Sequence, residues 1–142
     1  MGRLYSERQL RYFEHARKAA EMSDFARARV GCVVVEGKQI VGVGFSSHRT
    51  HPLQKHYNQL RDLNKGKNII HSLHAEIMAL APIVGNPDIN WSKVEVYVYR
   101  ICNSRKFGMA RPCAACMGCI ADCNIRDVYY TTDVGYAHER IV

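Results

Sequence analysis

The sequence has no apolar run that approaches the length of a membrane-spanning helix. Its first residues turn polar at once, so it also lacks the apolar stretch of a secretory signal peptide. No internal repeat, low-complexity stretch or linker divides its 142 residues. These absences argue against a membrane protein, and they favour a single domain over residues 1–142 of a cytoplasmic protein.

A disulfide framework is not expected either, although the chain has six cysteines. Four of them crowd into one predicted helical segment, residues 113–123, and Cys32 lies in an apolar strand. Reduced thiols of a cytosolic protein fit this placement better than paired cysteines do.

Acidic residues are scarce in the first half of the chain. Residues 1–71 carry 13 Lys and Arg against 6 Asp and Glu, whereas residues 72–142 carry 7 of each. The whole formal net charge of +7 therefore belongs to the first half. This asymmetry predicts an anionic partner, either the phosphate of a nucleotide or a nucleic-acid backbone. An ordinary solvated basic surface is the competing interpretation.

Two short motifs carry the chemistry, a His-Ala-Glu triplet and a later Pro-Cys-Ala-Ala-Cys segment. They offer a metal ion one imidazole and two thiolates, with a carboxylate beside the imidazole: His74, Cys113, Cys116 and Glu76. Three protein ligands leave one tetrahedral position of zinc open for water, which is the arrangement of a catalytic site. Water bound there becomes a nucleophile near neutral pH.

The spacing within each motif predicts two helices that start at one ion. Side chains at i and i+2 of a regular helix point in nearly opposite directions, so His74 and Glu76 converge only if a helix starts at His74. Cys113 and Cys116 are three residues apart and share a helix face. Pro112 favours the first turn of that helix, whose N-terminus also stabilises thiolates.

Each motif has a simpler interpretation when it is taken alone. A CxxC pair is also typical of redox proteins, Glu76 fits a solvated helix position, and His74 fits a hydrogen-bonded core histidine. A fourth sulfur ligand from Cys119 or Cys123 would close the site and make it structural, but both are displaced around or along the predicted helix. The motifs together favour a catalytic metal centre.

Hydrophobic periodicity predicts an α/β fold. A capping box at residues 6–9 starts a helix that runs to about Met22. Further helices are predicted at about residues 52–64, at residues 74–84 and in the cysteine segment, and strands at residues 29–35, 39–45, 94–99 and 127–132. The order predicts a three-layer α/β/α sandwich with a mixed sheet of four to five strands. A fifth strand after residue 132 must run antiparallel, because a parallel crossover needs about a dozen residues.

The segment at about residues 46–72 is a basic insert between the second strand and the metal helix. It has five basic residues against one acidic residue, and it holds four histidines: His48, His51, His56 and His71. A second zinc there would need a further ligand such as a cysteine, and the insert has no cysteine.

On its two motifs the chain resembles the cytidine and deoxycytidylate deaminase superfamily of zinc-dependent nucleotide deaminases, over roughly residues 29–132. Residues 74–80 look most like the branch that deaminates adenosine in tRNA. The short tail with residues 135–139 looks more like the branches that act on small substrates. The substrate therefore stays open. The family commonly assembles as dimers or larger, which implies a homo-oligomer.

The resemblance implies a role for each matching residue of the motifs. His74, Cys113 and Cys116 would hold Zn²⁺, and Glu76 would shuttle protons between water and the base. Ala75 would offer its backbone N–H to the carbonyl of the pyrimidine.

Substrate contacts outside the motifs fall on four further residues. Ser46 stands where the family has an asparagine that contacts the sugar, and Asn58 of the insert is a candidate replacement. Phe45 and Tyr136 are candidates for stacking on the base, with a place in the core as the alternative.

The loop before the cysteine pair holds four basic residues and no acidic one. Arg105, Lys106 and Arg111 are therefore candidates for a phosphate contact, and a solvated loop is the alternative.

The sequence predicts a zinc-dependent hydrolase that converts cytosine to uracil in a free nucleotide or nucleoside such as dCMP and releases ammonia. The alternative is a polynucleotide deaminase that acts on cytosine in single-stranded DNA or on adenine in tRNA, which the positive charge also fits. A structural zinc protein is the third possibility. Glu76 argues against it, because a structural site needs no proton shuttle.

Overall fold

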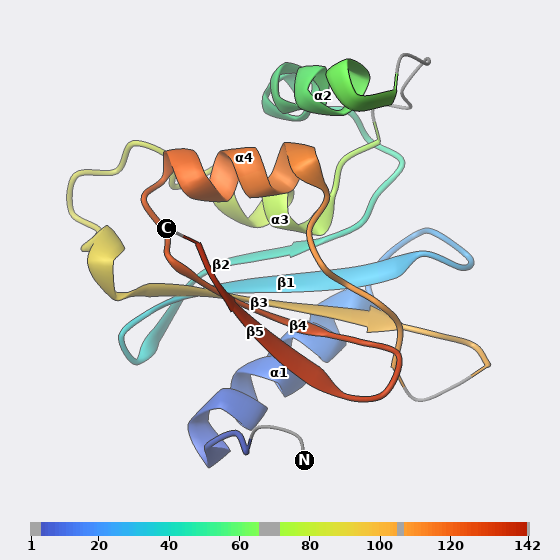
Figure 1. Cartoon of the computed structure of the whole chain (residues 1–142), viewed down its shortest axis with the longest axis vertical. Helices are drawn as coiled ribbons and strands as arrows, with labels where there is room; N and C mark the ends of the chain where they lie inside the picture. The colour runs from blue at the N-terminus through green and yellow to red at the C-terminus, as the bar shows by residue number, and fades with distance from the viewer. Residues whose placement is uncertain (1–3, 66–71, 105–106, 142) are drawn as a thin grey trace.

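A computed structural model describes residues 4–65, 72–104 and 107–141. It places a five-stranded sheet between α1 on one face and α3 and α4 on the other (Figure 1). The predicted three-layer α/β/α sandwich with a mixed sheet is therefore confirmed. Within the described residues, no helix is both long enough and apolar enough to cross a membrane.

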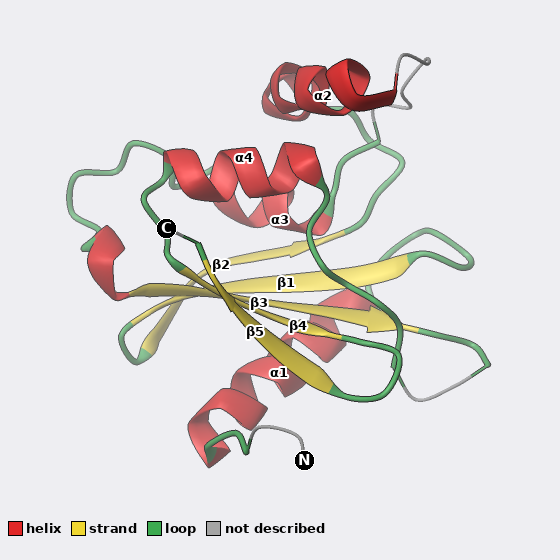
Figure 2. Ribbon diagram, viewed as in Figure 1, coloured by secondary structure: helices red, strands yellow, loops and turns green. Residues whose placement is uncertain are grey.

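The strands and helices lie close to their predicted places (Figure 2). The strands are β1 (Arg29–Glu36), β2 (Gln39–Phe45), β3 (Val94–Ile101), β4 (Asp127–Thr131) and β5 (Tyr136–Arg140). The helices are α1 (Glu7–Ala20), α2 (Pro52–Lys65), α3 (Ala75–Leu80) and α4 (Ala114–Asp122), with a short 3-10 helix η1 (Trp91–Lys93) before β3.

The sheet has the strand order β2-β1-β3-β4-β5. Only β3 and β4 pair in parallel, and α4 makes the crossover between them. The other neighbours are antiparallel, including β5 against β4, as the short tail predicted. α3 comes after β2 and α2 in the chain, and α4 comes after β3. The two helices nevertheless lie on the same face of the sheet (Figure 1).

The metal helix is shorter than predicted. The sequence pattern predicted a helix over residues 74–84, whereas α3 ends at Leu80 and continues as turns to Gly85. Pro82 explains the difference, because it has no backbone N–H to donate to the carbonyl of Met78. Ile83 donates instead to the Leu80 carbonyl at 2.9 Å.

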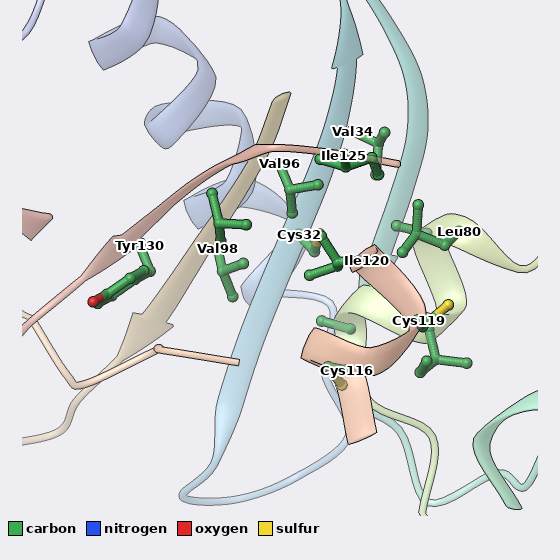
Figure 3. Close-up of a cluster of buried hydrophobic side chains, with 14 of the residues drawn as sticks. Cys32, Val34, Leu80, Val96, Val98, Cys116, Cys119, Ile120, Ile125 and Tyr130 are labelled. Carbon is green, nitrogen blue, oxygen red and sulfur yellow. The ribbon is translucent and has the colours of Figure 1, made fainter. Parts of the chain in front are cut away.

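Two separate cores flank the sheet. Between α1 and the sheet lies an aromatic cluster in which Tyr97 and Tyr129 stack at 4.6 Å. On the other face, aliphatic residues of β1 and β3 pack against α3 and α4. Figure 3 shows Cys32 and Val98 from these strands facing Ile120 of α4.

The insert adds a helix outside these three layers. α2 packs on the outer side of α4, beyond the layer that covers the sheet (Figure 1). Gly118 of α4 leaves the space that the Leu60 and Tyr57 side chains occupy. Residues 66–71 of the insert, which include His71, lie outside the described residues.

Two glycines of β2 let α3 lie directly on the sheet. A Cβ on Gly44 would lie 2.6 Å from the Ala79 nitrogen and 3.0 Å from the Met78 Cβ, and a Cβ on Gly42 would meet the Ala79 carbonyl. Only a residue without a side chain allows this approach. β2 therefore sets how deep α3, and with it His74, lies in the protein.

We expect Gly44→Ala to lower the free energy of unfolding by about 1–3 kcal/mol, because the added methyl group meets helix backbone that cannot move aside without shifting α3. Urea unfolding followed by circular dichroism measures the change. Gly135→Ala is the matched control, since a Cβ at Gly135 meets nothing within 4 Å. Equal stability of the two variants would show that α3 is not held against β2.

Candidate functional site

His74 and the two motif cysteines lie where two helices begin. His74 is the N-cap of α3, with an extended backbone (φ −81°, ψ 154°), so it escapes the i, i+2 divergence of a regular helix and its side chain can face the same site as Glu76. Cys113 is the N-cap of α4, and Cys116 is in its first turn. Pro112 lies just before the N-cap, two residues before α4 begins, and so outside the first turn in which the sequence placed it.

The three donor atoms converge on one point. His74 Nδ1 lies 3.3 Å from Cys116 Sγ and 3.6 Å from Cys113 Sγ, and all three atoms are within 4.8 Å of one another. Tetrahedral zinc with typical bond lengths places nitrogen and sulfur ligands about 3.6 Å apart. The donor set and its spacing therefore fit Zn²⁺ held by three protein ligands.

The protonation of the two cysteines agrees with a metal site. A hydrogen bond from Cys116, followed by the contact with His74, lowers the pKa of Cys113 to about 3. The same hydrogen bond and burial raise the pKa of Cys116 well above its ordinary value. This pairing favours the thiolate form of Cys113, and a cation at this point would replace the proton of Cys116.

Glu76 is the buried carboxyl of the site. It is only 5% exposed, and burial raises the pKa of its carboxyl above the ordinary value. Cys116 forms a hydrogen bond to it. A carboxyl whose pKa is raised is suited to accept a proton and then give it away.

A cavity of about 300 Å³ opens in front of these residues. Ligand pockets in proteins start at about this size. Its lining combines the metal-site residues with the loop before β1, the end of β3 and the segment before α4: Phe25, Ala28, Val30, Ser46, Ser72, His74, Ala75, Glu76, Arg100, Met109, Ala110, Arg111 and Cys113.

Ser46 lines the cavity, but its hydroxyl is engaged elsewhere. It donates to the Ala28 carbonyl at 2.7 Å, accepts from the Val30 N–H at 3.0 Å and contacts the Ser23 hydroxyl at 2.7 Å. A hydroxyl has one proton, and here it is committed to Ala28. A sugar contact in which Ser46 donates would have to displace that hydrogen bond.

The two described arginines of the cavity differ in their partners. Arg111 forms a bidentate pair with Glu139, with both N–O distances at 2.8 Å, and Tyr130 donates to the same carboxylate. The guanidinium of Arg100 makes no hydrogen bond or ion pair with any part of the chain that the structure describes. Arg105 and Lys106 lie outside the described residues.

Other predicted substrate residues lie away from the cavity. Phe45 and Asn58 do not belong to its described lining. Tyr136 packs on Phe13 at 4.1 Å, in the aromatic core on the opposite face of the sheet. The aromatic residue of the cavity that the sequence did not indicate is Phe25, which lies before β1 and packs against His48 with ring centroids 4.0 Å apart and tilted by 48°.

The remaining cysteines and histidines form no second metal group among the described residues. Cys119 and Cys123 hydrogen-bond to each other on α4, away from His74. His51 is occupied at the start of α2, where its Nδ1 accepts the Leu53 N–H at 3.0 Å.

Known proteins share both the motif and the fold. The model of the cytidine and deoxycytidylate deaminase zinc-binding region matches residues 6–132. The dCMP deaminase of cyanophage S-TIM5 in apo form is similar in structure, with a TM-score of 0.60 and 21% identity over 91% of this chain and 86% of that chain. The same enzyme in complex with dCMP and dUMP gives a TM-score of 0.60 and 20% identity over 92% and 85%.

A cytidine deaminase from Burkholderia pseudomallei has a TM-score of 0.60 and 13% identity over 96% of this chain and 93% of that chain. At such identities the similarity shows the fold alone. No curated protein sequence is a significant match.

We expect Cys113→Ala to lose the bound zinc, because only two of the three donor atoms remain. The measurement is the zinc content of dialysed protein by atomic spectrometry. Cys123→Ala is the control on the same helix and should keep one zinc per chain. Two zincs in the unchanged protein, or full zinc in Cys113→Ala, would contradict the assignment of ligands.

Proposed function

Because the chain belongs to the cytidine and deoxycytidylate deaminase family, we propose that it is a zinc-dependent hydrolase that deaminates the cytosine of a free nucleotide, with dCMP as the model substrate. The observation that carries the proposal is the convergence of an imidazole and two sulfurs beside a buried carboxyl, at the wall of a small cavity. The cyanophage dCMP deaminase, which shares the fold, has been solved in complex with dCMP and dUMP.

The residues of the site divide the reaction between them. His74, Cys113 and Cys116 would hold the zinc, which when bound makes water nucleophilic near neutral pH. Glu76 takes a proton from the attacking water and delivers protons to N3 of the ring and to the departing amine, so that water and cytosine become uracil and ammonia. Ala75, which lines the cavity, would donate its backbone N–H to the carbonyl of the pyrimidine.

Arg100 supports a substrate that carries phosphate. Its backbone is fixed on both sides, since its N–H donates to Thr131 Oγ1 at 3.1 Å and its carbonyl accepts the Gly108 N–H at 3.1 Å. Its stem crosses Gly108, where a Cβ would lie 2.9 Å from the Arg100 Cγ. A held arginine at the cavity with no partner among the described residues is suited to an anionic group.

The described part of the insert gives little support to a polynucleotide substrate. Of its described basic side chains, Arg61 turns inward toward His74, which leaves Arg49 and Lys55 exposed. A groove for single-stranded nucleic acid needs basic and aromatic residues that follow a backbone. The polynucleotide reaction therefore remains the alternative that the assay must exclude. The formation of a homo-oligomer also stays a prediction.

We expect the zinc-loaded protein to release ammonia from dCMP faster than from deoxycytidine, a cytosine-containing single-stranded oligonucleotide or tRNA. The kcat of Glu76→Gln, which keeps the shape of the side chain, should be lower by about 100-fold or more, while the variant still binds zinc. Turnover of the oligonucleotide or tRNA alone would replace the proposal by the polynucleotide alternative. Full activity of Glu76→Gln would show that Glu76 is not the proton shuttle.

A second prediction separates the two arginines. Arg100→Ala should lower kcat/KM for dCMP by about 10-fold or more, because a charge-assisted contact to phosphate is lost, and should leave deoxycytidine unchanged. Arg111→Ala should change the ratio of the two substrates less, since Arg111 is already paired with Glu139. An equal loss for dCMP and deoxycytidine in Arg100→Ala would mean that this side chain does not read the phosphate.

A further inference from the structure

The helix of the insert, α2, turns a row of polar side chains toward the metal site. Gln54 and Asn58 are fully buried, each 0% exposed, and Arg61 is half-buried. The three lie on one face of the helix, since they are four and three residues apart. Buried amides are almost always hydrogen-bonded, so the partners of this row show what it serves.

Outside α2, the partner of the row among the described residues is His74. Gln54 Oε1 accepts the backbone N–H of His74 at 2.9 Å, and Gln54 Nε2 donates to Asn58 Oδ1 at 2.8 Å. Arg61 Nη1 lies 3.4 Å from both Asn58 Oδ1 and His74 Nε2. These contacts form a closed ring that touches His74 at its backbone and at the side of the imidazole away from the sulfurs.

This ring supplies what α3 itself lacks. In a capping box the side chain at the third helical position accepts the backbone N–H of the N-cap residue, but in α3 that position is Ile77, which has no acceptor. The backbone N–H of His74 precedes the helix and is therefore fixed from outside, by Gln54. The Gln54 amide has one possible orientation, since its oxygen must face the N–H and its amino group must face the Asn58 oxygen.

We propose that Gln54 and Asn58 are positioning residues for His74, and that the insert braces the metal centre. The row holds the backbone of His74 so that Nδ1 stays aimed between the two sulfurs. Groups that orient a metal-binding histidine typically change metal affinity by about 10–100-fold. The effect on zinc is independent of the substrate, and only the effect on turnover rests on the proposed function.

The test compares three variants of α2. Gln54→Met removes both hydrogen bonds at similar volume, Gln54→Glu keeps an acceptor for the His74 N–H, and Gln59→Met changes an exposed position of the same helix. Zinc affinity is measured by competition with a chelator. We expect about 10–100-fold weaker binding in Gln54→Met, a smaller loss in Gln54→Glu and no change in Gln59→Met.

Two further readouts separate positioning from mere stability. The visible spectrum of the cobalt-substituted protein reports ligand geometry, and it should change in Gln54→Met but not in Gln59→Met. With dCMP, Gln54→Met at saturating zinc should lose kcat with little change in KM. If Gln54→Met does not fold, the zinc affinity of Gln54→Glu is compared with that of the unchanged protein instead.

The proposal is overturned if folded Gln54→Met binds zinc and cobalt as the unchanged protein does. It is also overturned if Gln54→Glu weakens zinc as much as Gln54→Met, since the acceptor would then be irrelevant. A protein that binds zinc as expected but deaminates nothing would instead refute the proposed function and leave the positioning role standing.

Discussion

The structure depends on two helices that begin at metal-ligand residues. A residue inside a helix cannot share a direction with its neighbour two positions later, but an N-cap residue can, because its backbone is still extended. His74 and Cys113 both occupy this position, with ψ values of 154° and 174°. The same geometry leaves both helix starts without a side-chain cap. The metal centre and the helix ends therefore compete for the same side chains.

Because the side chain of His74 does not cap α3, contacts from other elements hold the start of this helix in place. Gly42 and Gly44 bring α3 onto β2, and Gln54 takes the backbone N–H that no capping side chain secures. β2 sets the depth of His74, and α2 holds it from outside. A helix added beyond the three layers thus contacts the backbone of the histidine at the metal site, although it packs on the outer side of α4.

Local rules predicted the elements, and they failed where distant residues meet. The i, i+2 spacing of His74 and Glu76 was enough to predict a helix start at His74, and the short tail was enough to predict an antiparallel β5. The predicted end of α3 was wrong, because the prediction followed the pattern of apolar residues past Pro82. The sequence offers Asn58 as a sugar contact, yet the structure buries it on α2, where it accepts a hydrogen bond from Gln54. Nothing in the sequence indicates that Gln54 and His74 are hydrogen-bonded.

Net charge is a second property of the sequence that does not show where the charges lie in the fold. The excess of positive charge lies in residues 1–71, but the described arginines of the cavity, Arg100 and Arg111, come from the half whose charges balance. Two arginines of the first half are paired on the far side of the sheet, Arg17 with Glu14 and Glu21 and Arg8 with Glu95. Recognition of an anion depends on a cation that the fold leaves without a partner, and here Arg100 meets that condition among the described residues. A single placed charge therefore says more about the substrate than the sum over the chain.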